Sequence, residues 1–153
     1  MEVEAKFSIP DERTVQRLRE PTTLAGFSLE DPTVSELHDR YLDTTDGAFL
    51  AGGYACRLRR QNGQTIATLK GLGSVSGAVH RRVEVEVNLP GLLPPQHWPA
   101  SPARQLALRL GGKEALLPLF EIRQSRHRRR LNDGLRAVAE LNLDRIDLPR
   151  GDL

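Results

Sequence analysis

Arg82-Val83-Glu84-Val85-Glu86-Val87 is the stretch that decides the fold, because charged and apolar residues alternate along it without a break. Successive side chains of an extended strand point to opposite faces, so the alternation predicts a strand over residues 79–89 with one charged and one apolar face. A sheet built from such strands has to cover its apolar faces, either by packing them under helices or by closing into a barrel.

The same period of two recurs along most of the chain. Further strands are predicted over residues 2–9, 34–43, 54–60, 64–70, 117–131 and 135–143. Asn62-Gly63 and Asn132-Asp133-Gly134 are hairpin and turn signals between neighbouring strands. Helices are predicted only over residues 11–19 and 103–110, with a loop or bulged hairpin over residues 71–77 and a loop over residues 90–102. The sequence therefore predicts a β-dominated α+β fold, an antiparallel sheet or barrel with short flanking helices.

Composition narrows the class of protein. The 153 residues are enough for one domain, and 22 basic against 20 acidic residues give a net charge of only +2. Cys56 is the only cysteine, which excludes an intrachain disulfide framework and a thiolate-rich zinc site. No apolar run approaches the ~20 residues of a membrane span, and the first residues do not resemble a signal peptide. We therefore expect a cytoplasmic protein with no membrane partner.

Arginines and carboxylates are segregated on different strand faces. Arg57 and Arg59 share one face, whereas Glu140 and Asp144 share another. If these faces point into a curled sheet, the interior holds basic and acidic walls that require compensation. A polyphosphate would satisfy the arginines, and a divalent metal would satisfy the carboxylates. An open sheet with one solvated charged face is the alternative.

These residues resemble the signatures of the CYTH, or triphosphate tunnel metalloenzyme, superfamily. Glu2-Val3-Glu4-Ala5-Lys6 matches its E-x-E-x-K motif, and the other matches follow in the family's order. They are Tyr41-Leu42-Asp43-Thr44, Arg57-Leu58-Arg59, Thr68-Leu69-Lys70, Arg82 to Glu86, and Glu140 to Asp144. The resemblance covers nearly the whole chain. It is closest to bacterial inorganic triphosphatases, in which such a domain often precedes a helical CHAD domain.

The resemblance implies one domain over residues 1–153, an antiparallel β-barrel enclosing a charged tunnel. It implies Mg²⁺ or Mn²⁺ as cofactor, with Glu2, Glu4, Glu84, Glu140 and Asp144 as metal ligands. It implies that triphosphate or polyphosphate is bound by Lys6, Arg57, Arg59, Lys70, Arg82, Arg126 and Arg128. Among these residues, Glu4, Lys6 and Glu140 are the expected catalytic residues.

The end of the sequence departs from the family pattern. Family members close the tunnel with a last strand of alternating glutamates, whereas this sequence stops at Gly151-Asp152-Leu153. We therefore expect that the chain is truncated relative to the family or that a partner supplies the strand. Because an open sheet edge invites pairing with another chain, a homodimer is a further expectation.

The first functional hypothesis is metal-dependent hydrolysis of inorganic triphosphate or a related triphosphate. Two alternatives stay open. One is a non-catalytic module that binds triphosphate or polyphosphate, with a CHAD domain in a longer chain as its partner, and the other is an adenylate cyclase. A nucleic-acid-binding barrel is not expected, because aromatic residues, which provide stacking platforms for bases, are only 5% of the chain.

Overall fold

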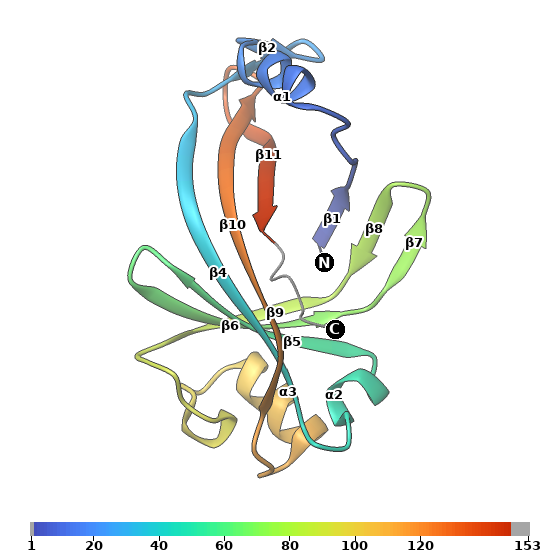
Figure 1. Cartoon of the computed structure of the whole chain (residues 1–153), viewed down its shortest axis with the longest axis vertical. Helices are drawn as coiled ribbons and strands as arrows, with labels where there is room; N and C mark the ends of the chain where they lie inside the picture. The colour runs from blue at the N-terminus through green and yellow to red at the C-terminus, as the bar shows by residue number, and fades with distance from the viewer. Residues whose placement is uncertain (1, 148–153) are drawn as a thin grey trace.

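Antiparallel strands make up most of the computed structural model, which describes residues 2–147 (Figure 1). The main sheet contains, in order, β2 (Thr23–Leu24), β3 (Phe27–Leu29), β10 (Leu117–Asn132), β4 (Thr33–Asp43), β5 (Tyr54–Gln61), β6 (Gln64–Gly71) and β9 (Glu84–Leu89), and β11 (Ala137–Asp147) pairs with β10. A second sheet contains β1 (Glu2–Ala5), β8 (Val79–Arg82) and β7 (Ser74–Ser76). The β-dominated antiparallel fold predicted from the sequence is confirmed.

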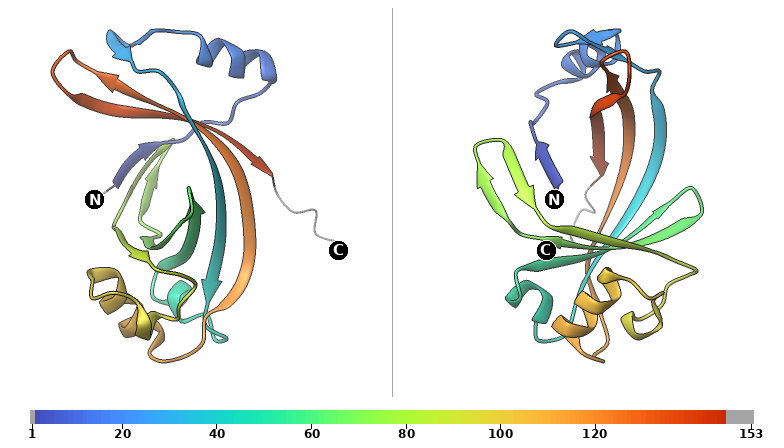
Figure 2. Two further views of the ribbon diagram at one scale, coloured as in Figure 1. Left: turned by 90° about the vertical axis from the view of Figure 1, so that its left-hand side faces the viewer. Right: turned by 180° about the vertical axis from the view of Figure 1, so that it is seen from behind.

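Short helices lie at the two ends of the molecule. They are α1 (Glu12–Arg19), α2 (Ala48–Ala51), the 3₁₀ helix η1 (Pro95–His97) and α3 (Pro102–Gly111). The side chains of Asp11 and Ser101 cap α1 and α3 by accepting hydrogen bonds from first-turn backbone N–H groups. Helix α1 lies at the opposite end from α2 and α3 (Figure 2). Among residues 2–147, no helix has the length and apolar character needed to span a membrane.

The apolar face of the main sheet packs under α2 and α3. Leu42, Leu58 and Leu69 lie on this face and are buried against a layer formed by Phe49 of α2, Trp98, and Leu106 and Ala107 of α3. Burial of this apolar surface is the main stabilising contribution to the fold. Because strand side chains alternate, it also leaves Asp39 of β4, Arg57 and Arg59 of β5, and Lys70 of β6 on the other, concave face.

Several elements differ from the sequence prediction. The predicted strand 79–89 is divided at Val83, whose carbonyl accepts a hydrogen bond of 2.8 Å from the Gly71 N–H. On either side of this point the chain pairs with different neighbours, β1 and β7 before it and β6 after it. Helix α2 was not expected from the sequence. It begins where the buried Asp43 carboxylate accepts hydrogen bonds from the Phe49 and Leu50 N–H groups.

The predicted barrel is not closed within the described residues. The two sheets are connected through Val83, but β1 does not pair with β11 in residues 2–147. The family's closing strand is expected only after Gly151-Asp152-Leu153, where the given sequence stops, and these last residues lie outside the described ones. Closure therefore stays a prediction.

A buried arginine ties the N-terminal helix to the main sheet. Arg129 on β10 donates hydrogen bonds to the carbonyls of Glu30, Arg19 and Pro21, at 2.8, 3.1 and 2.6 Å. Its neighbour Arg128 points to the opposite face, as alternation requires. Arg129 is therefore buried, and its guanidinium satisfies backbone carbonyls next to α1.

Cys56 provides a test of the apolar face. Burial raises the pKa of its thiol to about 12, and the negative charge of Asp43 adds to the shift. The thiolate is the reactive form, so we expect the folded protein to resist alkylation by iodoacetamide at about pH 8 and the urea-unfolded protein to react. Mass spectrometry measures the modified fraction with time. Rapid modification of the folded protein would contradict this placement.

Candidate functional site

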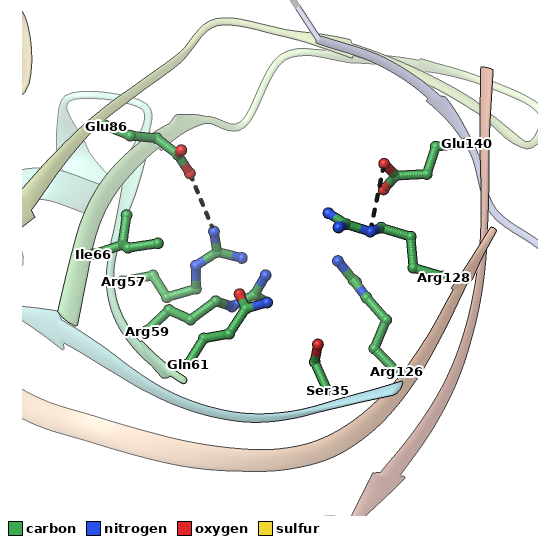
Figure 3. Close-up of a pocket in the computed structure, with 9 residues that line it drawn as sticks. All are labelled: Ser35, Arg57, Arg59, Gln61, Ile66, Glu86, Arg126, Arg128 and Glu140. Carbon is green, nitrogen blue, oxygen red and sulfur yellow. Dashed lines mark ion pairs between the residues drawn. The ribbon is translucent and has the colours of Figure 1, made fainter. Parts of the chain in front are cut away.

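A cavity of about 170 Å³ opens on the concave face of the main sheet (Figure 3). It is lined by Ser35, Arg57, Arg59, Gln61, Ile66, Glu86, Arg126, Arg128 and Glu140. Four arginines face two glutamates, so the wall carries a net positive charge. The structure thus brings four of the seven predicted phosphate-binding residues to one cavity.

Strand alternation and antiparallel register explain why these arginines meet. Arg57 and Arg59 are two apart on β5, and Arg126 and Arg128 are two apart on β10, so each pair shares a face. Strand β4 lies between β5 and β10, and its small Ser35 leaves room between the two pairs (Figure 3).

The β5 arginines are held from behind by buried groups. Arg59 makes a bidentate pair with Asp39 of β4, with both N–O distances at 2.7 Å. Arg57 Nη1 lies 3.9 Å from the same carboxylate, and its Nη2 donates a 3.1 Å hydrogen bond to Thr68 Oγ1. The Thr68 hydroxyl in turn donates to Glu86 at 3.0 Å. These contacts fix both guanidinium groups before any ligand is bound.

The β10 arginines are paired with carboxylates of the neighbouring strand. Arg126 makes a bidentate pair with Asp144 at 2.7 Å, and Arg128 Nε lies 3.9 Å from Glu140 Oε2. Hydrogen bonding to Asp144 raises the pKa of Arg126 above its usual value, so this guanidinium stays charged. Both carboxylates stand on β11, which has no partner beyond β10 among the described strands.

Lys70 lies on the same concave face but outside the cavity wall. Its Nζ is 2.9 Å from Glu84 Oε2, and Glu84 Oε1 is 3.8 Å from Arg57 Nη2. Glu84 therefore lies between Lys70 and Arg57 and contacts both.

The N-terminal motif forms a separate charged group on the smaller sheet. Glu4 forms ion pairs with Lys6, at 3.2 Å, and with Arg82 of β8. The backbone of Glu2 is opposite Arg82 in the strand register, whereas the Glu2 side chain lies outside the part of the chain that is described. Lys6 and Arg82 are not on the wall of the arginine cavity.

The predicted metal ligands are distributed over both groups. Within residues 2–147, no three Asp, Glu, His or Cys side chains converge on one point. Mg²⁺, however, is commonly held by one or two carboxylates together with substrate phosphates, and not by an all-protein cage. Glu140 and Asp144, two hard-oxygen donors on one face of β11 beside arginines, fit this manner of binding.

Sequence reasoning missed the groups that hold and separate the arginines. They are Ser35, Asp39, Gln61, Ile66, Thr68 and Glu86. Asp39 is the most informative, because it is directly opposite Arg59 in the β4–β5 register. The period of two along β4 places Asp39 on the same face as Tyr41, which the sequence could have indicated. The sequence does not give the register, and only the register shows which arginine Asp39 pairs with.

A second charged cluster lies on the outer face of the sheet. Glu121 of β10 accepts a hydrogen bond from Arg40 Nε at 2.7 Å and contacts His38 Nε2 at 2.8 Å. These hydrogen bonds, chiefly that of His38 and then that of Arg40, lower the pKa of the Glu121 carboxyl. The cluster is separated from the arginine cavity by the sheet itself.

This lowered pKa makes the stability contribution of Glu121 dependent on pH. The contribution is present above the unfolded-state pKa and is lost as the pH falls through the folded-state pKa. We therefore expect Glu121→Gln to lower the free energy of unfolding at neutral pH and to match the unsubstituted protein in acid. Urea unfolding across an acid pH series measures this, with the exposed Glu36→Gln as control. A deficit that is independent of pH would contradict the assignment.

Comparisons with known proteins match most of the chain. The family model of the CYTH domain matches residues 1–149. A solved structure from Hippeastrum, HpAC1, is described as a putative adenylyl cyclase with a dominant triphosphatase activity. It matches with a TM-score of 0.72 at 21% identity, over 96% of this chain and 73% of that one. The PH1819 protein from Pyrococcus horikoshii OT3 matches with a TM-score of 0.50 at 21% identity, over 76% of this chain and 60% of that one. At these identities the likeness concerns the fold.

Proposed function

The chain belongs to the CYTH domain family, and from this membership we propose that it hydrolyses inorganic triphosphate, or a related triphosphate, with the help of Mg²⁺ or Mn²⁺. The observation that carries the proposal is the cavity in which four arginines face two glutamates. Phosphate oxygens are strong acceptors for guanidinium groups, which bind them in bidentate, charge-assisted pairs. Triphosphate supplies several such oxygens in a row.

In this proposal the arginines bind and neutralise the phosphate chain. Arg57 and Arg59 offer guanidinium groups from one wall, and Arg126 and Arg128 offer them from the other. Positioning of the substrate and stabilisation of negative charge account for most of the catalysis of phosphoryl transfer. Lys70, Lys6 and Arg82 extend the same positive charge toward the smaller sheet.

The proposed metal ligands are Glu140 and Asp144 of β11, with Glu2, Glu4 and Glu84 contributing from the other strands. A bound Mg²⁺ or Mn²⁺ supplies Lewis-acid polarisation of phosphoryl oxygens and a water of lowered pKa. When phosphate oxygens take over Arg126 and Arg128, Asp144 and Glu140 lose these two cationic partners. The chain's own residues thereby make two carboxylates available together with the substrate.

Two alternatives remain for the same cavity. The first is a non-catalytic module that binds triphosphate through the same arginines and does not hydrolyse it. An adenylyl cyclase is the second alternative, and it would produce cyclic AMP from ATP. Release of inorganic phosphate from triphosphate distinguishes the proposed activity from both.

Arg128 provides a direct test, because it lines the cavity and is not deeply buried. Loss of one charged hydrogen bond weakens binding by about 1.5–3 kcal/mol, so we expect Arg128→Ala to raise KM for triphosphate accordingly. Arg123→Ala is the matched control, since Arg123 stands exposed on the opposite face of the same strand. Phosphate release by the full chain is measured with Mg²⁺ or Mn²⁺ and with a chelator.

Each result of this assay has a definite meaning. Equal effects of the two alanine variants would remove the arginine cavity from the mechanism. Triphosphate binding by the unsubstituted chain without any phosphate release would favour the binding module over the enzyme.

Glu140 tests the metal assignment separately from turnover. Affinity for hard cations depends on the number of charged oxygen ligands, so we expect Glu140→Gln to weaken Mn²⁺ binding in the presence of triphosphate by about tenfold or more. The electron paramagnetic resonance signal of free Mn²⁺ gives the bound fraction. Glu36→Gln, which changes an exposed glutamate of β4, is expected to bind Mn²⁺ normally. Normal binding by both variants would refute the role of Glu140.

A further inference from the structure

The two arginine pairs of the cavity are held in different ways. Arg59 is bonded to Asp39, whose side chain is 4% exposed, whereas the partners of Arg126 and Arg128 are 24% and 39% exposed. The first carboxylate lies under the guanidinium groups in the middle of the sheet. The other two lie on β11, where solvent reaches them. One wall is therefore fixed, and the other can exchange partners.

Asp39 cannot readily change its partner. It occupies the interior strand β4, with β10 on one side and β5 on the other. A buried carboxylate without a cation is strongly unfavourable, and the bidentate bond to Arg59 supplies that cation. A ligand that drew Arg59 away would remove both short bonds and leave Asp39 with only the longer, 3.9 Å contact to Arg57. Arg59 must therefore stay in place and present its outer edge to the ligand.

The same carboxylate acts on the other guanidinium groups of the cavity. Arg57 Nη1 lies 3.9 Å from Asp39 Oδ2, while its Nη2 is fixed by Thr68. The pKa of Arg126 is raised chiefly by hydrogen bonding to Asp144, and the charge of Asp39 contributes to the same shift. Asp39 itself does not line the cavity. Any effect that it has on a ligand passes through the arginines.

We infer that Asp39 is a positioning residue that holds Arg57 and Arg59 as a preformed phosphate-binding wall, while exchange of partners on ligand binding is confined to Arg126 and Arg128. This inference rests on the proposed function, because it assumes that a triphosphate occupies the cavity. A preformed wall lowers the ordering penalty of binding. It also gives the site a rigid spacing of guanidinium groups, against which the length of the phosphate chain is selected.

The test uses isothermal titration calorimetry to measure the Kd of inorganic triphosphate for the full chain without divalent metal. Asp39→Asn removes the charge that holds Arg59, and a misplacement of about 1 Å in a binding group can reduce function by roughly a hundredfold. We expect Kd to rise by about tenfold to a hundredfold. Asp39→Glu keeps the charge but moves the carboxylate, so Kd is expected to rise for this variant as well.

Glu121→Gln is the matched control, because it also removes a carboxylate that is hydrogen-bonded to an arginine, but on the outer face. Its Kd for triphosphate is expected to be unchanged. A merely structural role of Asp39 would lower the melting temperature without changing Kd, so both quantities are measured for every variant.

A double-mutant cycle separates positioning from a general loss of charge. If Asp39 acts through Arg59, the combined effect of Asp39→Asn and Arg59→Lys on Kd is smaller than the product of the two single effects. In the double variant Asp39→Asn with Arg128→Lys, the change in Kd is expected to equal the product of the two single changes, because these residues act independently. Equal coupling to both arginines would overturn the inference.

The unsubstituted protein supplies a readout that does not depend on the folding of variants. In nuclear magnetic resonance spectra, the Arg59 Nε–H signal is expected to stay protected from solvent exchange on addition of triphosphate, whereas the Arg126 Nε–H signal is expected to shift. Loss of protection at Arg59 would overturn the inference.

If triphosphate binds but Asp39→Asn and Asp39→Glu bind it normally, this inference alone fails. If the unsubstituted chain binds no triphosphate, the proposed function fails with it.

Discussion

Compensation of a buried carboxylate is the constraint on which the arginine site depends. Asp39 is held in the middle of the sheet by Arg59, and removing one partner of such a buried pair typically destabilises a protein by about 3–5 kcal/mol. Arg57 is drawn into the same arrangement by Asp39 and Thr68. The pair is therefore part of the fold as well as of the site. Folding therefore leaves two guanidinium groups facing the cavity.

The helices determine on which side of the sheet these charges lie. Leu58 and Leu69 pack with Trp98 and the other residues that cover the outer face, so the alternate positions of the same strands have to point inward. The outer face away from the helices also carries charge, but there Glu121 pairs with Arg40 and His38 near solvent. Burial thus distinguishes two chemically similar clusters. The inner cluster combines buried anchors with a cavity of about 170 Å³, whereas the cavity lined by His38 and Arg40 has a volume of only about 30 Å³.

The sequence was sufficient to predict the long strands and much of the cavity, because both follow from the period of two, but it did not predict the short strands β2 and β3. It could not predict Asp39 as the partner of Arg59, since the pairing depends on the β4–β5 register, which local patterns leave open. Nor could it predict the division of the strand at Val83, because the change of neighbours there is a tertiary effect. The E-x-E-x-K motif identified the family correctly, but the structure holds Glu4 beside Arg82 and not beside the arginines of the cavity.

The excess of arginine over lysine can now be interpreted by position. Only three of the 22 basic residues are lysines, which composition alone could explain by codon usage. Yet Arg129 satisfies three backbone carbonyls, and Arg59 and Arg126 each form two parallel bonds to one carboxylate. A lysine ammonium is a compact charge that lacks this planar fork, so it cannot reproduce such bidentate geometry. At these positions the structure uses the planar guanidinium fork. Arg59 and Arg126 are two of the four arginines that line the cavity, so the bidentate bonds also set the orientation of their guanidinium groups toward it.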